Sequence, residues 1–295
     1  MDKGKEEIKK EIENLENEML QGNFWEDKVR AQSIIKRIGE MKDELLGRDK
    51  YDNGNAILSI LSGAGGDDAE DFSSMLLRMY SKYIESKGWQ MTLLHENKND
   101  VGGYRNISIE VSGRGAYGTL KNESGVHRLV RISPFNAKSL RHTSFSLVEV
   151  VPKLEKNDKA IEIPSDDLRI EFSKAGGPGG QNVNKRETAV RIIHIPTNIS
   201  VHVTTERSQE QNREKGVEIL KGKLYKKREE DKLKEKAGLS PTKNTEIEWG
   251  SQIRSYVLHP YKMVKDNRTG IEVSNVDAVL EDGLIEPFIE AEANL

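Results

Sequence analysis

The sequence predicts an elongated α+β protein built from several domains. First, 295 residues are enough for two or three domains. Second, only 35% of the residues are hydrophobic and 32% are charged, so each core is small relative to its surface. Third, helical periodicity at the start of the chain gives way to short alternating strands and then to one long, highly charged helix.

Residues 1–50 are predicted to form a helical hairpin. Gly22-Asn23 separates two stretches in which apolar residues recur at steps of three or four, the spacing of one helix face. These residues are Ile8, Ile12, Leu15 and Met19 in the first stretch, and Ile34, Ile38, Met41 and Leu45 in the second.

Residues 51–155 are predicted to form an α+β domain. A helix begins near Gly66, and we expect Asp67 or Asp68 to cap its N-terminus, where acidic groups complement the helix dipole. Alternating apolar and polar residues then predict strands at 107–111, 129–132 and 144–151.

Residues 163–238 are predicted to form a second α+β domain after a polar linker at 152–164. Its expected elements are strands at 168–172, 189–195 and 199–204, a glycine-rich loop after the first strand, and one charged helix over 209–236. The C-terminal segment, residues 245–295, is expected to hold one or two strands and a short helix near 284–293.

Composition excludes several classes of function. The 46 basic and 49 acidic residues nearly cancel, so only their distribution can indicate a nucleic-acid partner. The absence of cysteine excludes disulfides, cysteine-ligated zinc and thiol catalysis, and the six histidines lack metal-ligand spacing, so we expect no metal and no cofactor. Neither a signal peptide nor a membrane-spanning apolar run is present, which predicts a cytoplasmic protein without membrane contact. The GxGxxG pattern at 113–118 is expected to be a turn, because no helix is predicted after it.

The glycine-rich loop at 175–184 contains Gly179-Gly180-Gln181. Glycine lets backbone N–H groups approach a ligand without a Cβ in the way. The Gln181 carboxamide is a poor general base, so chemistry here depends on placed hydrogen-bond donors. Flanking positive charges at Lys174, Lys185 and Arg186 suit phosphate. The alternative is a flexible surface linker.

A basic segment runs from His127 to His142, and no acidic residue lies between Glu123 and Glu149. It holds Ser133-Pro134-Phe135, a proline-stiffened turn that presents a hydroxyl and a ring. Basic residues interleaved with hydroxyl, aromatic and imidazole groups are typical of single-stranded RNA recognition. The alternative is a structural turn in a basic surface hairpin.

Together these motifs resemble those of bacterial class I peptide chain release factors. The Gly-Gly-Gln loop follows the Ser-Pro-Phe tripeptide in the family's order, and Ser-Pro-Phe stands where the sister type has Pro-Xaa-Thr. Three further stretches support the resemblance, which runs from about residue 57 to the end: 124–131, 141–145 and 249–256.

The resemblance implies a factor that recognises the stop codons UAA and UGA in the ribosomal A site and releases the nascent chain. Its partners would be the mRNA, 16S and 23S rRNA, and the P-site peptidyl-tRNA. Ser133, Pro134 and Phe135 would form the codon-discriminating turn. The remaining codon-binding residues would be Val130 and Thr143 in a base pocket, His142 stacked between the second and third bases, and Gly66 and Asp68 facing the first uridine. The family usually has Glu where Asp68 stands.

For hydrolysis, the resemblance implies that Gly179 and Gly180 let the backbone N–H of Gln181 face the ester's leaving oxygen. Water is the nucleophile and ribosomal RNA completes the site, so the protein is a translation factor and not a stand-alone enzyme. Gln181 is a candidate for N5-methylation by a glutamine methyltransferase, and Trp249 resembles the family's switch region.

The resemblance also implies that residues 245–295 pack on the 51–155 domain. The helical hairpin is shorter than the family's N-terminal domain, which leaves open its contact with the ribosomal stalk base or a recycling GTPase release factor.

Two alternative functions stay open at this point. One is a codon-independent ribosome-rescue peptidyl-tRNA hydrolase, which would lack a codon-reading domain and end in a basic tail. Ser133-Pro134-Phe135 and the acidic end of the chain, which has no Lys or Arg after Arg268, argue against it. The other is a non-catalytic RNA-binding protein, against which the intact Gly179-Gly180-Gln181 argues.

Overall fold

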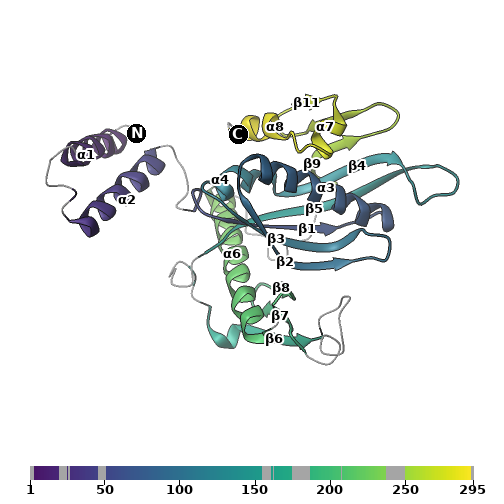
Figure 1. Ribbon diagram of the computed structural model, residues 1–295, viewed down its shortest axis with the longest axis horizontal. Helices are drawn as coiled ribbons and strands as arrows, with labels where there is room; N and C mark the ends of the chain where they lie inside the picture. The colour runs from purple at the N-terminus through teal and green to yellow at the C-terminus, as the bar shows by residue number, and fades with distance from the viewer. Residues whose placement is uncertain are drawn as a thin grey trace. The chain divides into compact units, whose positions relative to one another are not determined.

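The computed structural model describes residues 3–19, 25, 27–45, 51–154, 161, 163–174, 187–206, 208–236 and 250–293 (Figure 1). The chain divides into two compact units, Met1–Asn53 and Gly54–Leu295. Nowhere in the described ranges does a helix combine the length and the apolar character needed to cross a bilayer.

The first unit is the predicted pair of helices, α1 (Lys3–Met19) and α2 (Lys28–Leu45). Their shared core contains the predicted apolar positions: Ile12, Ala31, Ile34, Ile38 and Met41 are buried, with Ile8, Leu15 and Met19 packed against them. Two ion pairs between the helices, Arg30–Glu18 and Arg37–Glu11, flank this core. The helical hairpin is therefore confirmed.

The second unit is organised by an eight-stranded sheet. Its order is β11-β10-β9-β4-β5-β1-β3-β2, and every neighbouring pair is antiparallel except β4 and β9, which are parallel. The strands are β1 (Ala56–Ser62), β2 (Gln90–Lys98), β3 (Tyr104–Ser112), β4 (Gly125–Ile132), β5 (Arg141–Pro152), β9 (Gln252–Val257), β10 (Met263–Asp266) and β11 (Glu272–Val273).

Helix α3 (Asp67–Ser86) covers this sheet and buries the rings of Phe72, Tyr80 and Tyr83. Its N-cap is Gly66, and no side chain caps it, so the expected capping by Asp67 or Asp68 is wrong. Asp68 is buried instead, because its carboxylate contacts another segment of the chain.

The GxGxxG segment at 113–118 also differs from expectation, because a short helix, α4 (Ala116–Leu120), begins within it and a 3-10 turn (Lys121–Glu123) follows. Gly113 has a packing reason: a Cβ there would lie 2.1 Å from the Trp89 ring.

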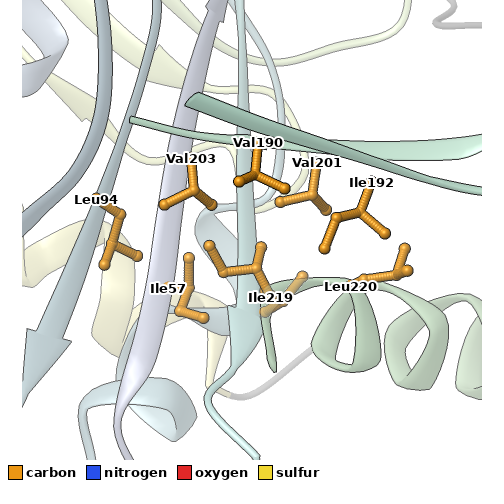
Figure 2. Close-up of a cluster of buried hydrophobic side chains, with 9 residues drawn as sticks. Ile57, Leu94, Val190, Ile192, Val201, Val203, Ile219 and Leu220 are labelled. Atoms are coloured by element: carbon orange, nitrogen blue, oxygen red, sulfur yellow. The ribbon is translucent and has the colours of Figure 1, made fainter. Parts of the chain in front are cut away.

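The second sheet has three antiparallel strands, and a long helix packs on it. The elements are β6 (Leu168–Ser173), preceded by a 3-10 turn (Ser165–Asp167), then β7 (Ala189–His194), β8 (Ile199–Val203) and α6 (Gln209–Lys236). These strands and the helix bounds agree with the prediction. Figure 2 shows the buried cluster that joins this sheet and α6 to the large sheet. Its members are Val190, Ile192, Val201, Val203, Ile219 and Leu220 on one side, and Ile57, Leu94 and Val151 on the other.

Helix α6 approaches β5 closely. A Cβ at Gly222 would lie 2.5 Å from the Pro152 carbonyl oxygen, so this contact requires glycine. Two lysines of α6 add polar contacts here. Lys223, next to Gly222, pairs with Glu149 at 2.5 Å, and Lys226, one helical turn after Gly222, donates from Nζ to the Val150 carbonyl oxygen at 3.0 Å. The helix is thereby fastened to the large sheet by both backbone contact and charge.

A pair of imidazoles interrupts the apolar contact between the two sheets. The rings of His95 on β2 and His202 on β8 lie 4.6 Å apart, and His95 Nδ1 is 3.1 Å from Thr204 Oγ1. Burial, together with His202, lowers the pKa of His95 to about 4. Burial and Arg191 also lower the pKa of His202. Both rings are therefore neutral at neutral pH.

The C-terminal segment completes the large sheet. It supplies three short strands and two short helices, α7 (Val276–Leu280) and α8 (Glu286–Glu292), where the sequence predicted one or two strands and one helix. Parallel pairing of β9 with β4 adds this segment to the sheet that α3 covers, which confirms the expected packing.

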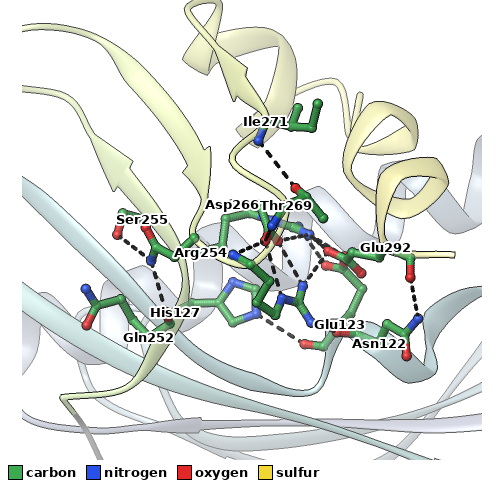
Figure 3. Close-up of polar contacts among 12 residues, drawn as sticks. Asn122, Glu123, His127, Gln252, Arg254, Ser255, Asp266, Thr269, Ile271 and Glu292 are labelled. Carbon is green, nitrogen blue, oxygen red and sulfur yellow. Dashed lines mark hydrogen bonds and ion pairs between the residues drawn. The ribbon is translucent and has the colours of Figure 1, made fainter. Parts of the chain in front are cut away.

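A buried ionic network fastens this segment (Figure 3). Arg254 is fully buried, and its guanidinium binds both oxygens of Glu123, at 2.8 and 2.5 Å. It also donates to Glu292 Oε1 at 2.5 Å and lies 3.3 Å from Asp266 Oδ2, while Arg268 bridges the same two carboxyl groups. Burial and the nearby Glu123 raise the pKa of Glu292 to about 9, so two cations meet two carboxylates and one neutral carboxyl.

We expect Glu292→Gln to change the free energy of unfolding at pH 4.5, where both side chains are neutral, by less than about 1 kcal/mol, whereas Glu123→Gln should cost about 3–5 kcal/mol, because it removes the carboxylate that binds the buried Arg254 through both oxygens. The folded-state pKa of Glu292 lies above its ordinary value, so its contribution is full below about pH 4.5 and is lost as the pH rises toward 9. The Gln variant should therefore gain stability relative to wild type over that range. Urea unfolding from pH 4.5 to 9 measures this, and equal costs for the two variants would contradict it.

Acidification should weaken the fold through the buried imidazoles. The folded-state pKa of His95, and that of buried His127, are each about 4, below the ordinary value of 6.5. Their stabilising neutral forms are fully populated above pH 6.5 and are lost as the pH falls toward 4, by up to about 2 kcal/mol per histidine at pH 5. Comparing urea unfolding at pH 7 and pH 5, His95→Gln should reduce this loss, and the exposed His259→Gln should not.

Candidate functional site

The predicted RNA-binding residues meet at one end of the large sheet. The hairpin between β4 and β5 carries Ser133, Pro134 and Phe135, and the N-terminus of α3 lies against it through Asp68. In this hairpin Arg131 pairs with His142 across the strands, and Val130 pairs with Thr143. Because successive residues of a strand face opposite sides, these two pairs lie on opposite faces of the hairpin.

Asp68 accepts hydrogen bonds from three other residues of the site. Its carboxylate is only 4% exposed; Oδ2 accepts from Ser133 Oγ at 2.6 Å and from His142 Nδ1 at 2.9 Å, and Oδ1 accepts from Arg131 Nη2 at 3.0 Å. Burial opposes ionisation, but the hydrogen bonds from Ser133, His142 and Arg131 outweigh it and hold the pKa of Asp68 below its ordinary value. The site is therefore built around a buried carboxylate.

The hydrogen bonds on His142 fix its protonation pattern. Nδ1 lies against the Asp68 carboxylate, which only accepts, and Nε2 lies 3.1 Å from the Asn136 side-chain nitrogen, which only donates. The arrangement that satisfies both contacts is a neutral ring with its proton on Nδ1. The ring stays about two-fifths exposed, since 38% of the side-chain surface is accessible.

The tripeptide turn has one buried and two exposed members. Ser133 is 3% exposed, and its Oγ accepts from the Phe135 backbone N–H at 3.2 Å while donating to Asp68. Pro134 and Phe135 face solvent, and the Phe135 ring lies 6.0 Å from the Arg131 guanidinium carbon, within cation–π range. The turn thus presents an exposed ring on a fixed backbone.

Two residues that the sequence did not single out individually complete the site. Arg131 joins Asp68 to Asp71, which it binds at 2.7 Å, and Asn136 orients His142. Both residues lie in or next to motifs that the sequence does reveal: Arg131 lies in the basic segment, and Asn136 directly follows Phe135.

The other predicted residues are placed as follows. Gly66 is exposed, with φ 57°, a left-handed conformation that favours glycine. Val130 is 8% exposed, and Thr143 is exposed. Asp68 directs both oxygens at protein groups, so its expected contact with a uridine stays a prediction.

The Gly-Gly-Gln motif and the switch candidate Trp249 lie outside the described residues, as do Lys185 and Arg186. The described residues that flank the glycine-rich loop lie on paired strands, where Ser173 of β6 faces Ala189 of β7. At the return end, the buried Asn212 of α6 donates to the Thr188 carbonyl oxygen at 2.7 Å and accepts from the Glu206 N–H at 2.9 Å. Asn212 therefore links the start of α6 to the base of the loop.

The described residues form no metal centre. Those residues contain no group of three or more His, Asp or Glu side chains placed to hold a metal ion.

Comparison with known proteins gives consistent matches. The chain matches the PCRF domain over residues 37–148 and the RF-1 domain over residues 155–268. It is 42% identical to peptide chain release factor 2 of Petrotoga mobilis, over 97% of this chain and 91% of that protein, and 48% identical to the Thermotoga petrophila protein of the same name, over 90% and 74%. Among solved structures, RF2 of Thermus thermophilus matches with a TM-score of 0.72 at 40% identity, covering 96% of this chain and 80% of that chain.

Asp68→Asn should loosen the hairpin, because an amide replaces the charge that three donors share. We expect a loss of about 1–3 kcal/mol in unfolding free energy and faster hydrogen exchange at the backbone amides of Ser133 and Phe135. Asp67→Asn, a neighbouring change at an exposed position, is the matched control. Equal exchange rates in the two variants would show that Asp68 does not order the turn.

Proposed function

This chain belongs to the bacterial class I peptide chain release factors, in the release factor 2 group, and we propose that it terminates translation specifically at the stop codons UAA and UGA. As a member of this family it is a termination factor that recognises stop codons and releases the nascent chain. The observation that carries the codon assignment is the Ser133–Pro134–Phe135 turn, fixed on Asp68 beside a half-exposed His142.

Codon recognition is proposed to use both faces of the hairpin. On one face, the neutral His142 ring stacks between the second and third bases, a contact worth roughly 1–3 kcal/mol per base. On the other, Val130 and Thr143 line a base pocket. Gly66, exposed at the N-terminus of the 20-residue helix α3, faces the first uridine with backbone donors. Asp68 is proposed to act as a positioning residue, since its oxygens are occupied by Ser133, His142 and Arg131.

Ser133 is proposed to read the second base. A hydroxyl has one proton and two lone pairs; here the proton goes to Asp68 and one lone pair to the Phe135 N–H. The remaining lone pair suits a donor, such as the 6-amino group of adenine. Guanine carries an acceptor oxygen at the same ring position, so binding it requires the Ser133 proton to turn away from Asp68. Both purines are accommodated, with adenine favoured.

Peptide release is proposed to use the Gly179-Gly180-Gln181 loop. Family membership supports this assignment, together with the anchoring of the loop base by Asn212. The backbone N–H of Gln181 would stabilise the developing negative charge while water attacks the ester, and losing one donor of this kind costs about 3–4 kcal/mol. Lys174, Lys185 and Arg186 would contact ribosomal RNA.

The partners proposed for this chain are the ribosome, with its mRNA, 16S and 23S rRNA and P-site peptidyl-tRNA, and a glutamine methyltransferase that modifies Gln181. A recycling GTPase release factor is a further proposed partner, and Trp249 is proposed as the switch between codon recognition and release.

Codon specificity is tested by single-turnover release on ribosomes programmed with UAA, UGA, UAG or a sense codon. We expect release at UAA and UGA, with a higher kcat/KM at UAA because Ser133 donates to Asp68 in the resting site. Release that ignores the codon would favour a ribosome-rescue hydrolase instead.

A pair of variants tests whether the Gly-Gly-Gln motif acts in peptide release and the Ser-Pro-Phe motif in codon binding. Gln181→Pro, which removes the proposed backbone donor, should bind UAA-programmed ribosomes like wild type but release peptide about 100- to 1000-fold more slowly, by the loss of transition-state stabilisation. Ser133→Ala should weaken binding at UAA while leaving the release rate at saturation nearly unchanged. If Gln181→Pro released peptide at the wild-type rate, the catalytic assignment would be wrong.

A further inference from the structure

We propose that the turn between β9 and β10, at residues 258–262, is a second RNA-binding surface beside the codon-reading hairpin, with the Tyr261 ring as a platform for an unpaired base. This proposal rests on the proposed function and extends it, because it assigns a contact to RNA other than the three codon bases.

The sheet topology brings the turn to the hairpin. Strand β9 lies beside β4 and runs parallel to it, with Val257 opposite Val130 (Figure 1). Parallel neighbours end at the same edge of a sheet, so the turn after β9 and the hairpin after β4 leave the sheet together. The Leu258 N–H donates to the Val130 carbonyl oxygen at 2.8 Å, which fixes the first residue of the turn one strand away from the base pocket.

The turn presents chemistry that suits a nucleic-acid base. Tyr261 is 57% exposed, and its ring makes no hydrogen bond or ring contact with the described residues. The turn is anchored on both sides of Tyr261. Before it, the Leu258 N–H is bonded to the Val130 carbonyl oxygen, and after it, Lys262 pairs with Asp277 at 2.7 Å. A large ring displayed on an anchored turn loses little conformational freedom when a base stacks on it.

The surroundings favour RNA over an apolar protein partner. Exposed His259 stands next to the ring in sequence, and the neighbouring hairpin contributes the exposed cations Lys138 and Arg141 without any acidic residue from 124 to 148. Phe135 and Tyr261 are two of the few strongly exposed aromatic rings in the described chain, and both lie at this end of the sheet. Exposed rings among unpaired cations match single-stranded RNA, whose bases stack and whose phosphates are negative.

The first test measures the affinity of the full-length chain for ribosomes programmed with UAA. Tyr261→Ala should weaken binding by about 5- to 100-fold, the loss expected for one stacked base, mainly through faster dissociation. Tyr261→Phe and Tyr261→Trp should bind within about twofold of wild type, because stacking needs the ring and not the hydroxyl. Leu284→Ala, which removes an equally exposed apolar side chain (59%) from the same segment, is the matched control. Thermal unfolding of each variant checks that the fold is intact.

A second test identifies the contacted molecule. A photoreactive benzoylphenylalanine at position 261 should cross-link to RNA in the UAA complex, and sequencing the adduct tells mRNA from ribosomal RNA as the source. A cross-link to protein alone would overturn the proposal, as would equal binding by Tyr261→Ala and wild type, or equal losses for Tyr261→Phe and Tyr261→Ala. The proposed function fails separately, if the wild-type chain does not release peptide at stop codons.

Discussion

The parallel pairing of β4 with β9, fastened by Arg254, is the constraint on which the functional end of the molecule depends. A fully buried guanidinium is stable only beside carboxylates, which here come from the turn before β4 and from β10, and α8 adds the neutral carboxyl group of Glu292. Hydrophobic contact alone would permit β9 to slide along β4. A bidentate bond to Glu123 permits one register, and that register sets where the strands end. Residues separated by more than a hundred positions are thereby held at one edge of the sheet.

The hairpin proposed to read the codon repeats this principle with the charges exchanged. Here a buried carboxylate, Asp68, draws donors from the hairpin, and each bond has a functional consequence. The bond to Ser133 orients a hydroxyl, and the bond to His142 selects one tautomer and one ring plane. Because the Asp68 carboxylate is withdrawn from solvent, the exposed groups beside it on the hairpin include the Phe135 ring and the His142 imidazole. These are the groups that read a base by shape and hydrogen bonding, without the repulsion that an exposed carboxylate would exert on phosphate.

Much of the fold could be predicted from periodicity, and the exceptions have physical causes. Strand β1 is apolar on both faces because it is central in the sheet, and a short apolar run of this kind does not distinguish strand from helix. Strand β2 is an edge strand whose residues are mostly exposed, so it lacks a clear alternation. The site residues Ser133, Phe135 and His142 could be predicted because their types cluster along the chain. Asp67 or Asp68 was expected to cap α3, which their local positions favour, but the hairpin 65 residues away from Asp68 binds the Asp68 carboxylate instead.

Helix α6 links the two halves of the proposed function physically. Its first turn contains Asn212, which holds the base of the glycine-rich loop, and the helix passes over β5, the strand that carries His142 at its other end. A continuous helix of 28 residues spans about 42 Å, so one element reaches from the loop base to the large sheet. Its fastening to the large sheet is apolar around Ile219 and Leu220, whereas the contact between β2 and β8 adds to apolar Leu94 the buried imidazole of His95 and the half-buried imidazole of His202. Such a polar contact contributes less to cohesion than apolar packing of the same area, so separation of the two sheets should begin at β2 and β8 and leave α6 on β5 until last.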